Sequence, residues 1–235
     1  MLFGRGKRET QKEPKLTSTR WKELLDGAWS DVLEDRLSMR GLGNWCWAGP
    51  WEDHRRRVLR VWLQRSCTCG TIQWGWNFDF IPHLTSSGLG WRRTDKSVGL
   101  ELFRVPEEYI DTARDRSQVM AGSWGEIAGE AAVQARDRQL LVQLLPRIEA
   151  YYRQTAAPEA LLAETEQLQQ QTWYRFTHGP QLAITRAFLL AALGRREEGA
   201  GVIQSIAWEA TPKADQQRAR LLTRLGQQEI LWTGR

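Results

Sequence analysis

The sequence predicts an α+β protein, in which an amphipathic helix packs on a curled antiparallel sheet of about four strands and a helical C-terminal half follows. Three observations support this fold class. Apolar residues recur at helical spacing near the N-terminus, they alternate with polar residues in the centre of the chain, and helical patterns return after Pro106. The length of 235 residues suits one or two domains.

The first predicted element is a helix that follows a polar arm. Residues 1–15 are charged and contain two glycines and a proline, so we expect a disordered basic arm there. Thr17, Ser18 and Thr19 can each cap the helix that begins next. Its apolar residues lie three or four positions apart, which predicts one buried face, and the helix should end before Gly41. The members of that face are Trp21, Leu24, Leu25, Ala28, Trp29, Val32, Leu33 and Leu37.

Four strands are predicted next, over 45–47, 58–65, 71–81 and 97–105. The third is the clearest, because its even positions are large and apolar while its odd positions are small or polar. We expect the leading helix to cover the even side, leaving the odd side to face solvent or the C-terminal helices. The even residues are Ile72, Trp74, Trp76, Phe78 and Phe80, and the odd ones are Thr71, Gln73, Gly75, Asn77 and Asp79.

The remainder is predicted to be helical. Ser123 and Glu126 fit a capping box, and the helix that they open should kink or break at Pro146. Further helices are expected over 159–170, 182–193, 196–207 and 214–225, and Gly194 is placed to end the second of these. Segment 183–207 resembles one tetratricopeptide hairpin, but no second copy is present. We therefore expect a unit of helix plus sheet over 16–106 and a helical half over 107–235 docked on it.

Composition and charge limit the function classes. No apolar run approaches a membrane span, and the N-terminus lacks the apolar stretch of a secretory signal. A cytoplasmic location is therefore expected, where the three cysteines stay reduced. The net charge of +5 comes from residues 1–20, with six Lys and Arg against two Glu, and from 40–104, with ten basic against five acidic residues. A basic segment of this kind attracts nucleic acid, an anionic lipid surface or an acidic protein, or is a solvated face.

Candidate reactive groups are few. Cys67 and Cys69, with Cys46 and His54 or His83, permit a zinc interpretation, but their spacing fits no structural zinc motif, and reduced structural cysteines are the alternative. Cys69 has no recognisable base partner for nucleophilic catalysis. Asp79 and Glu101 are carboxylates within predicted strands, suited to acid–base work or to pairing with arginine. No phosphate-loop, dinucleotide or hydrolase motif is present. We expect no metal and no cofactor.

The 13 tryptophans mostly follow the apolar alternation of their strands, so core packing explains them first. Trp62 differs, because it shares a side with Arg60 and Gln64 and not with the apolar positions. A tryptophan on the polar side of a sheet suits a protein-binding anchor. The predicted partner-binding residues are Arg60, Trp62, Gln64, Gln73, Asn77 and Asp79. The alternative is a stacking platform for nucleic acid, built from the tryptophans and arginines of 55–65.

The order of elements resembles a bacterial family of unknown function numbered 4304. The likeness rests on 58–66 leading to 74–80, on 144–148 with 158–161, and on the hairpin at 193–198, and it covers most of residues 20–210. The abundant tryptophan and the basic arm depart from the family pattern. The resemblance implies an α+β fold and transfers no catalytic residue. By analogy, small proteins of this kind look like immunity proteins, which neutralise a bacterial toxin by binding it.

These observations lead to three functional expectations. The first is a non-enzymatic protein-binding module, in the form of an immunity protein whose partner is a toxin or effector domain, with no membrane association. The second is a nucleic-acid-associated protein that uses the arm and the Trp/Arg-rich strand. The third is an uncharacterised enzyme that uses Asp79, Glu101 or Cys69.

Overall fold

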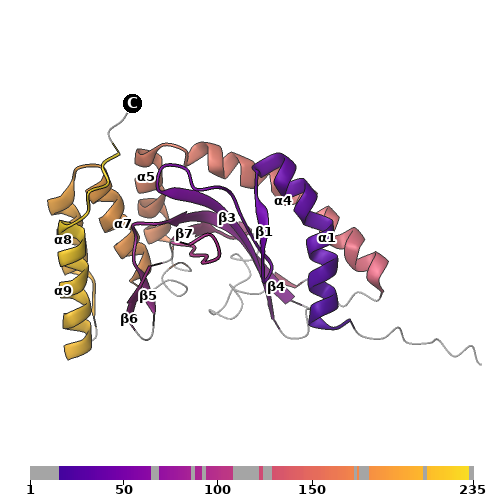
Figure 1. The fold of residues 1–235 in the computed structure, drawn as a ribbon, viewed down its shortest axis with the longest axis horizontal. Helices are drawn as coiled ribbons and strands as arrows, with labels where there is room; N and C mark the ends of the chain where they lie inside the picture. Colours follow the sequence, from indigo (N-terminus) through magenta and orange to yellow (C-terminus); the bar gives the residue numbers. More distant parts are fainter. Residues whose placement is uncertain are drawn as a thin grey trace, which may run out of the picture.

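The computed structural model places helices over one face of an antiparallel sheet, and more helices at one end of it (Figure 1). It describes residues 16–64, 69–85, 88–91, 94–107, 122–123, 129–171, 174, 180–208 and 211–232. The basic arm predicted over 1–15 lies outside these residues. The α+β class is confirmed, with a helix first, the sheet next and helices in the C-terminal half.

The main sheet has the strand order β1-β2-β3-β4-β7, every neighbouring pair being antiparallel, and β8 also pairs with β4. Five strands on this path replace the four predicted, and the sheet is not strongly curled. β5 and β6 form a separate hairpin. The bounds are β1 Arg40–Gly43, β2 Cys46–Ala48, β3 Arg55–Gln64, β4 Cys69–Phe78, β5 His83–Thr85, β6 Gly88–Gly90, β7 Leu102–Arg104 and β8 Gly122–Ser123.

Two helices, α1 (Ser18–Leu37) and α4 (Glu130–Gln154), lie side by side over the aromatic face of the sheet (Figure 1). Thr17 caps α1 by accepting a bond from the backbone nitrogen of Arg20, as expected. Trp29 of α1 packs on Trp47, with ring centroids 5.6 Å apart. Ion pairs join the two helix starts and their later turns, so the helices run in the same direction: Arg20–Glu130 at 2.6 Å and Arg36–Glu149 at 2.7 Å.

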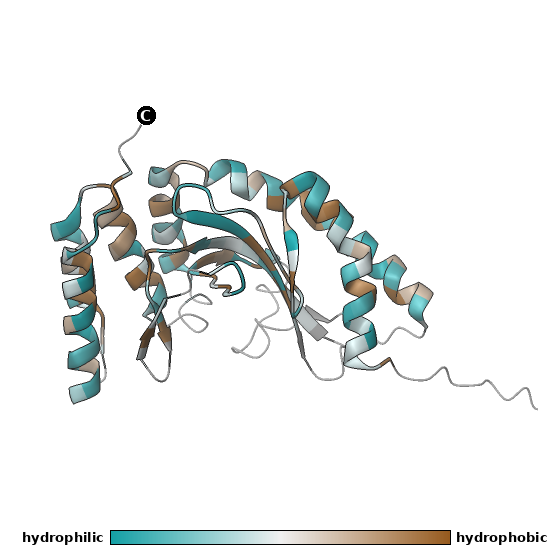
Figure 2. Ribbon diagram, in the orientation of Figure 1, coloured by the Kyte–Doolittle hydropathy of each residue, from teal (hydrophilic) through white to brown (hydrophobic). Residues whose placement is uncertain are grey.

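The remaining described helices are α5 (Pro158–Gln170), α7 (Gln181–Ala192), α8 (Arg196–Ser205) and α9 (Pro212–Gly226). α7 is buried along most of its length, whereas α9 is largely hydrophilic (Figure 2). Gly194, with φ of +78°, follows the end of α7 as predicted. Buried residues of the sheet and of the C-terminal helices belong to one continuous core. Within the described residues, no helix has the length and apolar character needed to cross a membrane.

Two local predictions are wrong, and of the kink or break predicted at Pro146 the break does not occur. The fourth strand shrinks from 97–105 to three residues, because the chain before Leu102 folds back over β4. Ser123 pairs with Cys69 in the sheet and does not cap a helix; α4 begins after Gly129. α4 also continues through Pro146. That proline removes only the hydrogen bond to the carbonyl of Val142, a residue that is 70% exposed, so water can replace the lost donor.

Candidate functional site

The long strand β3 carries side chains alternately to the two faces of the sheet. Its pairing with β4 sets Arg56 opposite Asn77, Arg60 opposite Gln73, and Trp62 opposite Thr71. These side chains share the face that the sequence predicts to be open, because neighbours in register point the same way. We call it the polar face, and define it by Arg56, Arg60, Trp62, Gln73 and Asn77. The aromatic residues of β4 occupy the other face, beneath α1 and α4.

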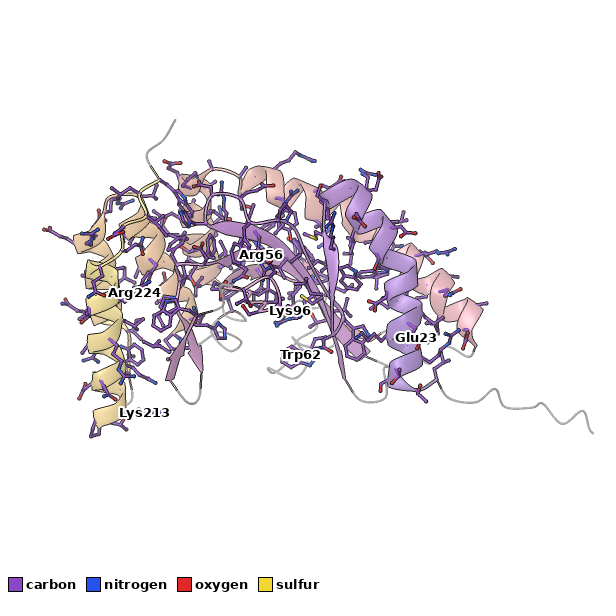
Figure 3. All side chains as sticks on the ribbon, in the orientation of Figure 1. Glu23, Arg56, Trp62, Lys96, Lys213 and Arg224 are labelled. Atoms are coloured by element: carbon purple, nitrogen blue, oxygen red, sulfur yellow. The ribbon has the colours of Figure 1, made fainter. Side chains whose placement is uncertain are left out.

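Trp62 is the exposed anchor of this face. Its side chain is 47% exposed, and it lies on the side of the sheet opposite to α4 (Figure 3). The guanidinium carbon of Arg60 lies 5.5 Å from the centroid of the Trp62 ring, within the range of a cation–π interaction. Arg60 in turn donates from Nε and Nη2 to the side-chain oxygen of Gln73, at 3.1 and 2.7 Å. The buried amide of Gln73 therefore positions the arginine that covers the tryptophan.

Gln73 and Asn77 are buried, at 2% and 0% exposure, so the prediction that they lie on an open surface is wrong. The physical reason is that each amide has partners inside the protein. Asn77 accepts a bond from Arg56 Nε at 3.0 Å and donates to Glu101 at 3.0 Å. A buried amide with satisfied hydrogen bonds avoids the cost of desolvation, and it supports the surface from below.

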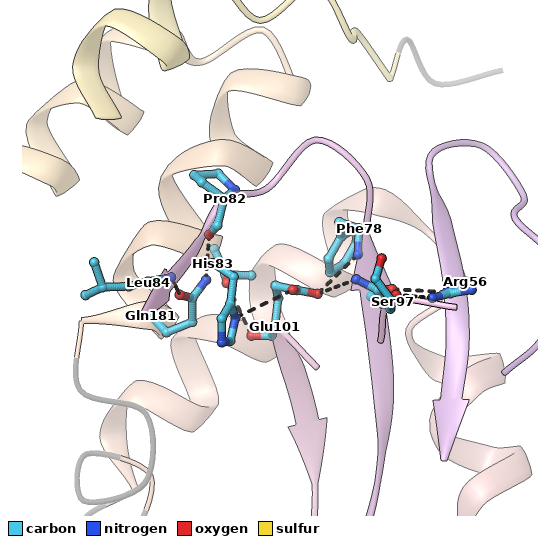
Figure 4. A network of polar contacts seen from close by, with 10 residues as sticks. Arg56, Phe78, Pro82, His83, Leu84, Ser97, Glu101 and Gln181 are labelled. Atoms are coloured by element: carbon cyan, nitrogen blue, oxygen red, sulfur yellow. Dashed lines mark hydrogen bonds and ion pairs between the residues drawn. The ribbon is translucent and has the colours of Figure 1, made fainter. Parts of the chain in front are cut away.

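Arg56 attaches a loop to the same face (Figure 4). Its Nη2 donates to the carbonyl of Ser97 at 2.5 Å, and its Nη1 to that of Asp95 at 3.1 Å. Trp51 covers the guanidinium, with the ring centroid 4.4 Å from the guanidinium carbon. Segment 94–101 is thereby held over β4, which explains why it does not continue as a strand. Sequence reasoning placed Arg56 only in the nucleic-acid alternative and did not single out Trp51, although alternation with Arg60 puts Arg56 on this face.

Glu101 completes the network on the interior side (Figure 4). Its carboxylate is fully buried and accepts bonds from the Asn77 amide and from the backbone nitrogen of Phe78, at 3.0 and 3.2 Å. His83 Nδ1 lies 3.8 Å from the other carboxylate oxygen. Gln181 of α7 bonds the backbone on both sides of His83, through Pro82 and Leu84. Glu101 therefore fixes loops and helices together, and the network is enclosed.

Asp79 does not join the polar-face cluster. Asp79 follows the end of β4, and its carboxylate lies 3.0 Å from His54 Nδ1. His54 and Asp79 line a hollow of about 510 Å³ beside α9. The side chain of Gln64 lies outside the described residues. Arg60 and Trp62 are thus the two predicted binding residues that the structure brings together at an accessible surface.

The cysteine and metal expectations are tested only in part. Burial raises the pKa of the Cys46 thiol to about 11, against a smaller opposing effect of Arg60 and Arg56, so this thiol is protonated near neutral pH. In the part of the chain that the structure describes, no group of three His, Cys, Asp or Glu side chains is placed to hold a metal ion. Cys67 and the side chain of Cys69 lie outside that part.

The arginine run at the start of β3 is divided between the two faces. Arg55 lies under the helices, with Trp76 and Trp232 at 5.2 and 5.3 Å from its guanidinium carbon. Arg56 is 3% exposed, and Arg57 lies 3.7 Å from Glu52. A stacking platform for single-stranded nucleic acid needs its cations and aromatic rings on one accessible groove. The arrangement of this run does not provide that.

Comparisons with known proteins find no match for the chain. No protein-family model matches it, and searches of curated proteins and of solved structures return no match either. The resemblance to the family numbered 4304 therefore stays a prediction from the sequence, and the function is argued from the surface that Arg60 and Trp62 form.

Proposed function

We propose that this chain is a non-enzymatic protein-binding module that contacts its partner through Trp62 and Arg60, and that it acts as an immunity protein against a bacterial toxin. The half-exposed indole of Trp62, held on a central strand, is the observation on which this proposal rests. Tryptophan and arginine are the residue types enriched among interface positions that dominate binding energy.

The contacts that Gln73 and Arg60 make behind Trp62 favour binding because they reduce the conformational entropy that is lost when the partner binds. A partner that orders a mobile side chain loses about 0.5–1.5 kcal/mol per residue to conformational entropy. Here Gln73 holds Arg60, and Arg60 covers the indole, so part of that cost is met in the free protein. The surface is thereby prepared for recognition before the partner arrives.

The assignment to the immunity class rests on the sequence resemblance and on analogy. A protein that neutralises a toxin by direct binding needs a rigid contact surface and no chemistry of its own. The direct test is to search the neighbouring genes for a toxin and to express it in a susceptible bacterium, together with the wild-type chain or a variant; the absence of such a gene counts against the immunity class. We expect the wild type to restore growth and Trp62→Ala to restore it poorly.

Trp91 offers a matched control. It is 40% exposed, and Arg224 lies 5.7 Å from its ring centroid, so it reproduces the chemistry of Trp62 at another place. Calorimetric titration with the toxin should show binding weakened about 30-fold or more by Trp62→Ala, which is the effect of an anchor worth about 2 kcal/mol. Trp91→Ala should bind like wild type. Equal behaviour of the two variants, or a wild type that gives no protection, contradicts the proposal.

Salt separates this proposal from the nucleic-acid alternative. Binding through several phosphates releases counterions, so it weakens steeply as salt rises. We expect oligonucleotide binding that is feeble and disappears at about 150 mM salt. Submicromolar binding that persists at that salt concentration favours the alternative.

A further inference from the structure

A second hollow lies on the helix-covered side of the sheet, opposite the polar face. It forms where the end of α1, the start of β3 and the last turns of α4 meet, and its volume is about 530 Å³. That volume falls within the range of small-molecule sites. Its charged lining residues are Arg36, Glu52, Arg55, Arg57, Glu149 and Arg153. We call it the arginine pocket.

The charges of the arginine pocket do not balance. Four arginines and two glutamates leave a formal charge of +2. Arg36 is paired with Glu149 at 2.7 Å, and Arg57 lies 3.7 Å from Glu52. Arg55 and Arg153 have no carboxylate within ion-pair distance in the described part of the chain. Two arginines therefore border the pocket without an ion pair in the part of the chain that the structure describes.

Arg55 is held in place by aromatic rings and makes no ion pair among the described residues. Its guanidinium carbon lies 5.2 Å from the Trp76 ring centroid and 5.3 Å from that of Trp232. Its Nη1 is buried and makes no hydrogen bond. Burial lowers the pKa of Arg55, and Asp53 and Glu52 oppose that shift. A cation removed from water without a counter-ion is costly, so a nearby anion would relieve this cost.

The aromatic wall beside these arginines is fixed by hydrogen bonds to other parts of the protein. Trp76 Nε1 donates to Thr155 Oγ1 at 2.8 Å, and the Tyr152 hydroxyl donates to the carbonyl of Val58 at 2.8 Å. Neither group needs a ligand to satisfy it. The pocket therefore combines a rigid apolar wall with two arginines that make no ion pair among the described residues, and this composition suits an organic anion.

We propose that the arginine pocket binds a small-molecule phosphate monoester, with Arg55 and Arg153 facing the phosphate and Trp76 lining the space for the organic group. A phosphate monoester carries a charge of about −1.5 to −2 at neutral pH, which matches the two unpaired arginines, whereas a monocarboxylate would match only one. Guanidinium groups also suit the geometry of phosphate oxygens. The site is separate from the Trp62 surface, so it stands whether or not the protein binds a toxin.

Calorimetric titration of the full chain with three probes tests the proposal. These are adenosine 5′-monophosphate, glucose 6-phosphate and inorganic phosphate, with unphosphorylated adenosine as the reference. We expect at least one monoester to bind with submillimolar affinity, and adenosine not to bind. Binding of inorganic phosphate alone overturns the assignment to a monoester, and the absence of binding by all three overturns the site.

Two arginine variants locate the site. Arg153 is exposed and makes no ion pair within the described residues, so Arg153→Ala should keep the fold while weakening monoester binding about tenfold, the effect of losing one charge-assisted contact. Arg138→Ala, at another exposed and unpaired arginine of α4, should leave binding unchanged. Arg55→Gln should weaken binding at least as much as Arg153→Ala. If Arg153→Ala and Arg138→Ala bind the monoester equally well, the arginine pocket is not the site.

Discussion

Replacing Tyr152 with phenylalanine removes one oxygen atom at a junction between α4 and the sheet. The hydroxyl of Tyr152 accepts a bond from the backbone nitrogen of Gly75 at 3.1 Å and donates to the carbonyl of Val58 at 2.8 Å. Those two residues face each other across β3 and β4. The hydroxyl therefore links the helix to both central strands at once.

The expected loss of stability follows from what the substitution leaves behind. Gly75 loses an acceptor and Val58 loses a donor at a buried position, and each unsatisfied buried group costs about 1–3 kcal/mol. Some local adjustment is expected, so we predict a loss of about 2 kcal/mol in the free energy of unfolding. For a chain of this size, that corresponds to a fall of about 4–8 °C in the melting temperature.

The adjacent residue supplies the control. The hydroxyl of Tyr151 is also buried but has no hydrogen-bond partner among the described residues, and burial raises its pKa well above the usual value. Tyr151→Phe removes an unsatisfied group, so it should leave stability unchanged or raise it. Urea unfolding, followed by tryptophan fluorescence, measures both variants. If Tyr152→Phe is no less stable than Tyr151→Phe, the bridging role of this hydroxyl is refuted.

Three further predictions concern burial and charge. Trp76→Ala should lower stability by about 3–5 kcal/mol, because the side chain is 7% exposed, while Trp62→Ala should hardly change it; equal losses in urea unfolding would contradict this. Stability should fall as pH rises from about 9 to 11, because burial keeps the Cys46 proton bound in the folded state, whereas the unfolded chain releases it first. Thermal melts of the wild type and of Cys46→Ala at pH 8 and 10.5 should show a smaller fall for the variant. An equal fall in both proteins would contradict this role of Cys46. Arg104→Met should lower the free energy of unfolding by about 3 kcal/mol, because it leaves the nearly buried carboxylate of Glu164 unpaired. Adding Glu164→Gln should restore much of that stability in thermal melts. If the double variant is no more stable than Arg104→Met, the lost ion pair is not the cause.

The elements that the sequence predicts correctly have local signals. The cap at Thr17 and the helical spacing after it identify α1, and strict alternation identifies β4. Of the kink or break predicted at Pro146, the break does not occur, because the exposure of Val142 decides the cost of the lost hydrogen bond, and exposure depends on how the helix packs. The sequence identifies Pro146 as unfavourable within a helix, but the tertiary structure decides whether the helix ends there.

Of the candidate site, the sequence correctly predicts the exposure of Trp62 but not the burial of Gln73 and Asn77. Trp62 departs from the apolar parity of its strand, and it is exposed. Gln73 and Asn77 follow the polar parity, yet they are buried, because their partners Arg60, Arg56 and Glu101 satisfy them. An amide bonded to water and an amide bonded to a distant side chain look alike in a sequence. Their distinction requires the long-range pairing that folds segment 94–101 over β4.

The position of Trp232 has a consequence for how the chain is made. Its ring packs against Phe78 and Phe80 at 6.3 and 5.3 Å, and its backbone nitrogen bonds the carbonyl of Ala192 at 2.7 Å. About 150 residues separate Phe78 from Trp232, so synthesis at about 5–20 residues per second leaves that aromatic surface open for roughly 10–30 s. The nascent protein therefore presents a hydrophobic surface that the finished protein conceals, and a chain stopped at residue 231 should bind a hydrophobic dye more strongly than the full chain. A chaperone that holds the growing chain would find its target at the end of β4, which closes only when the segment around Trp232 has left the ribosome.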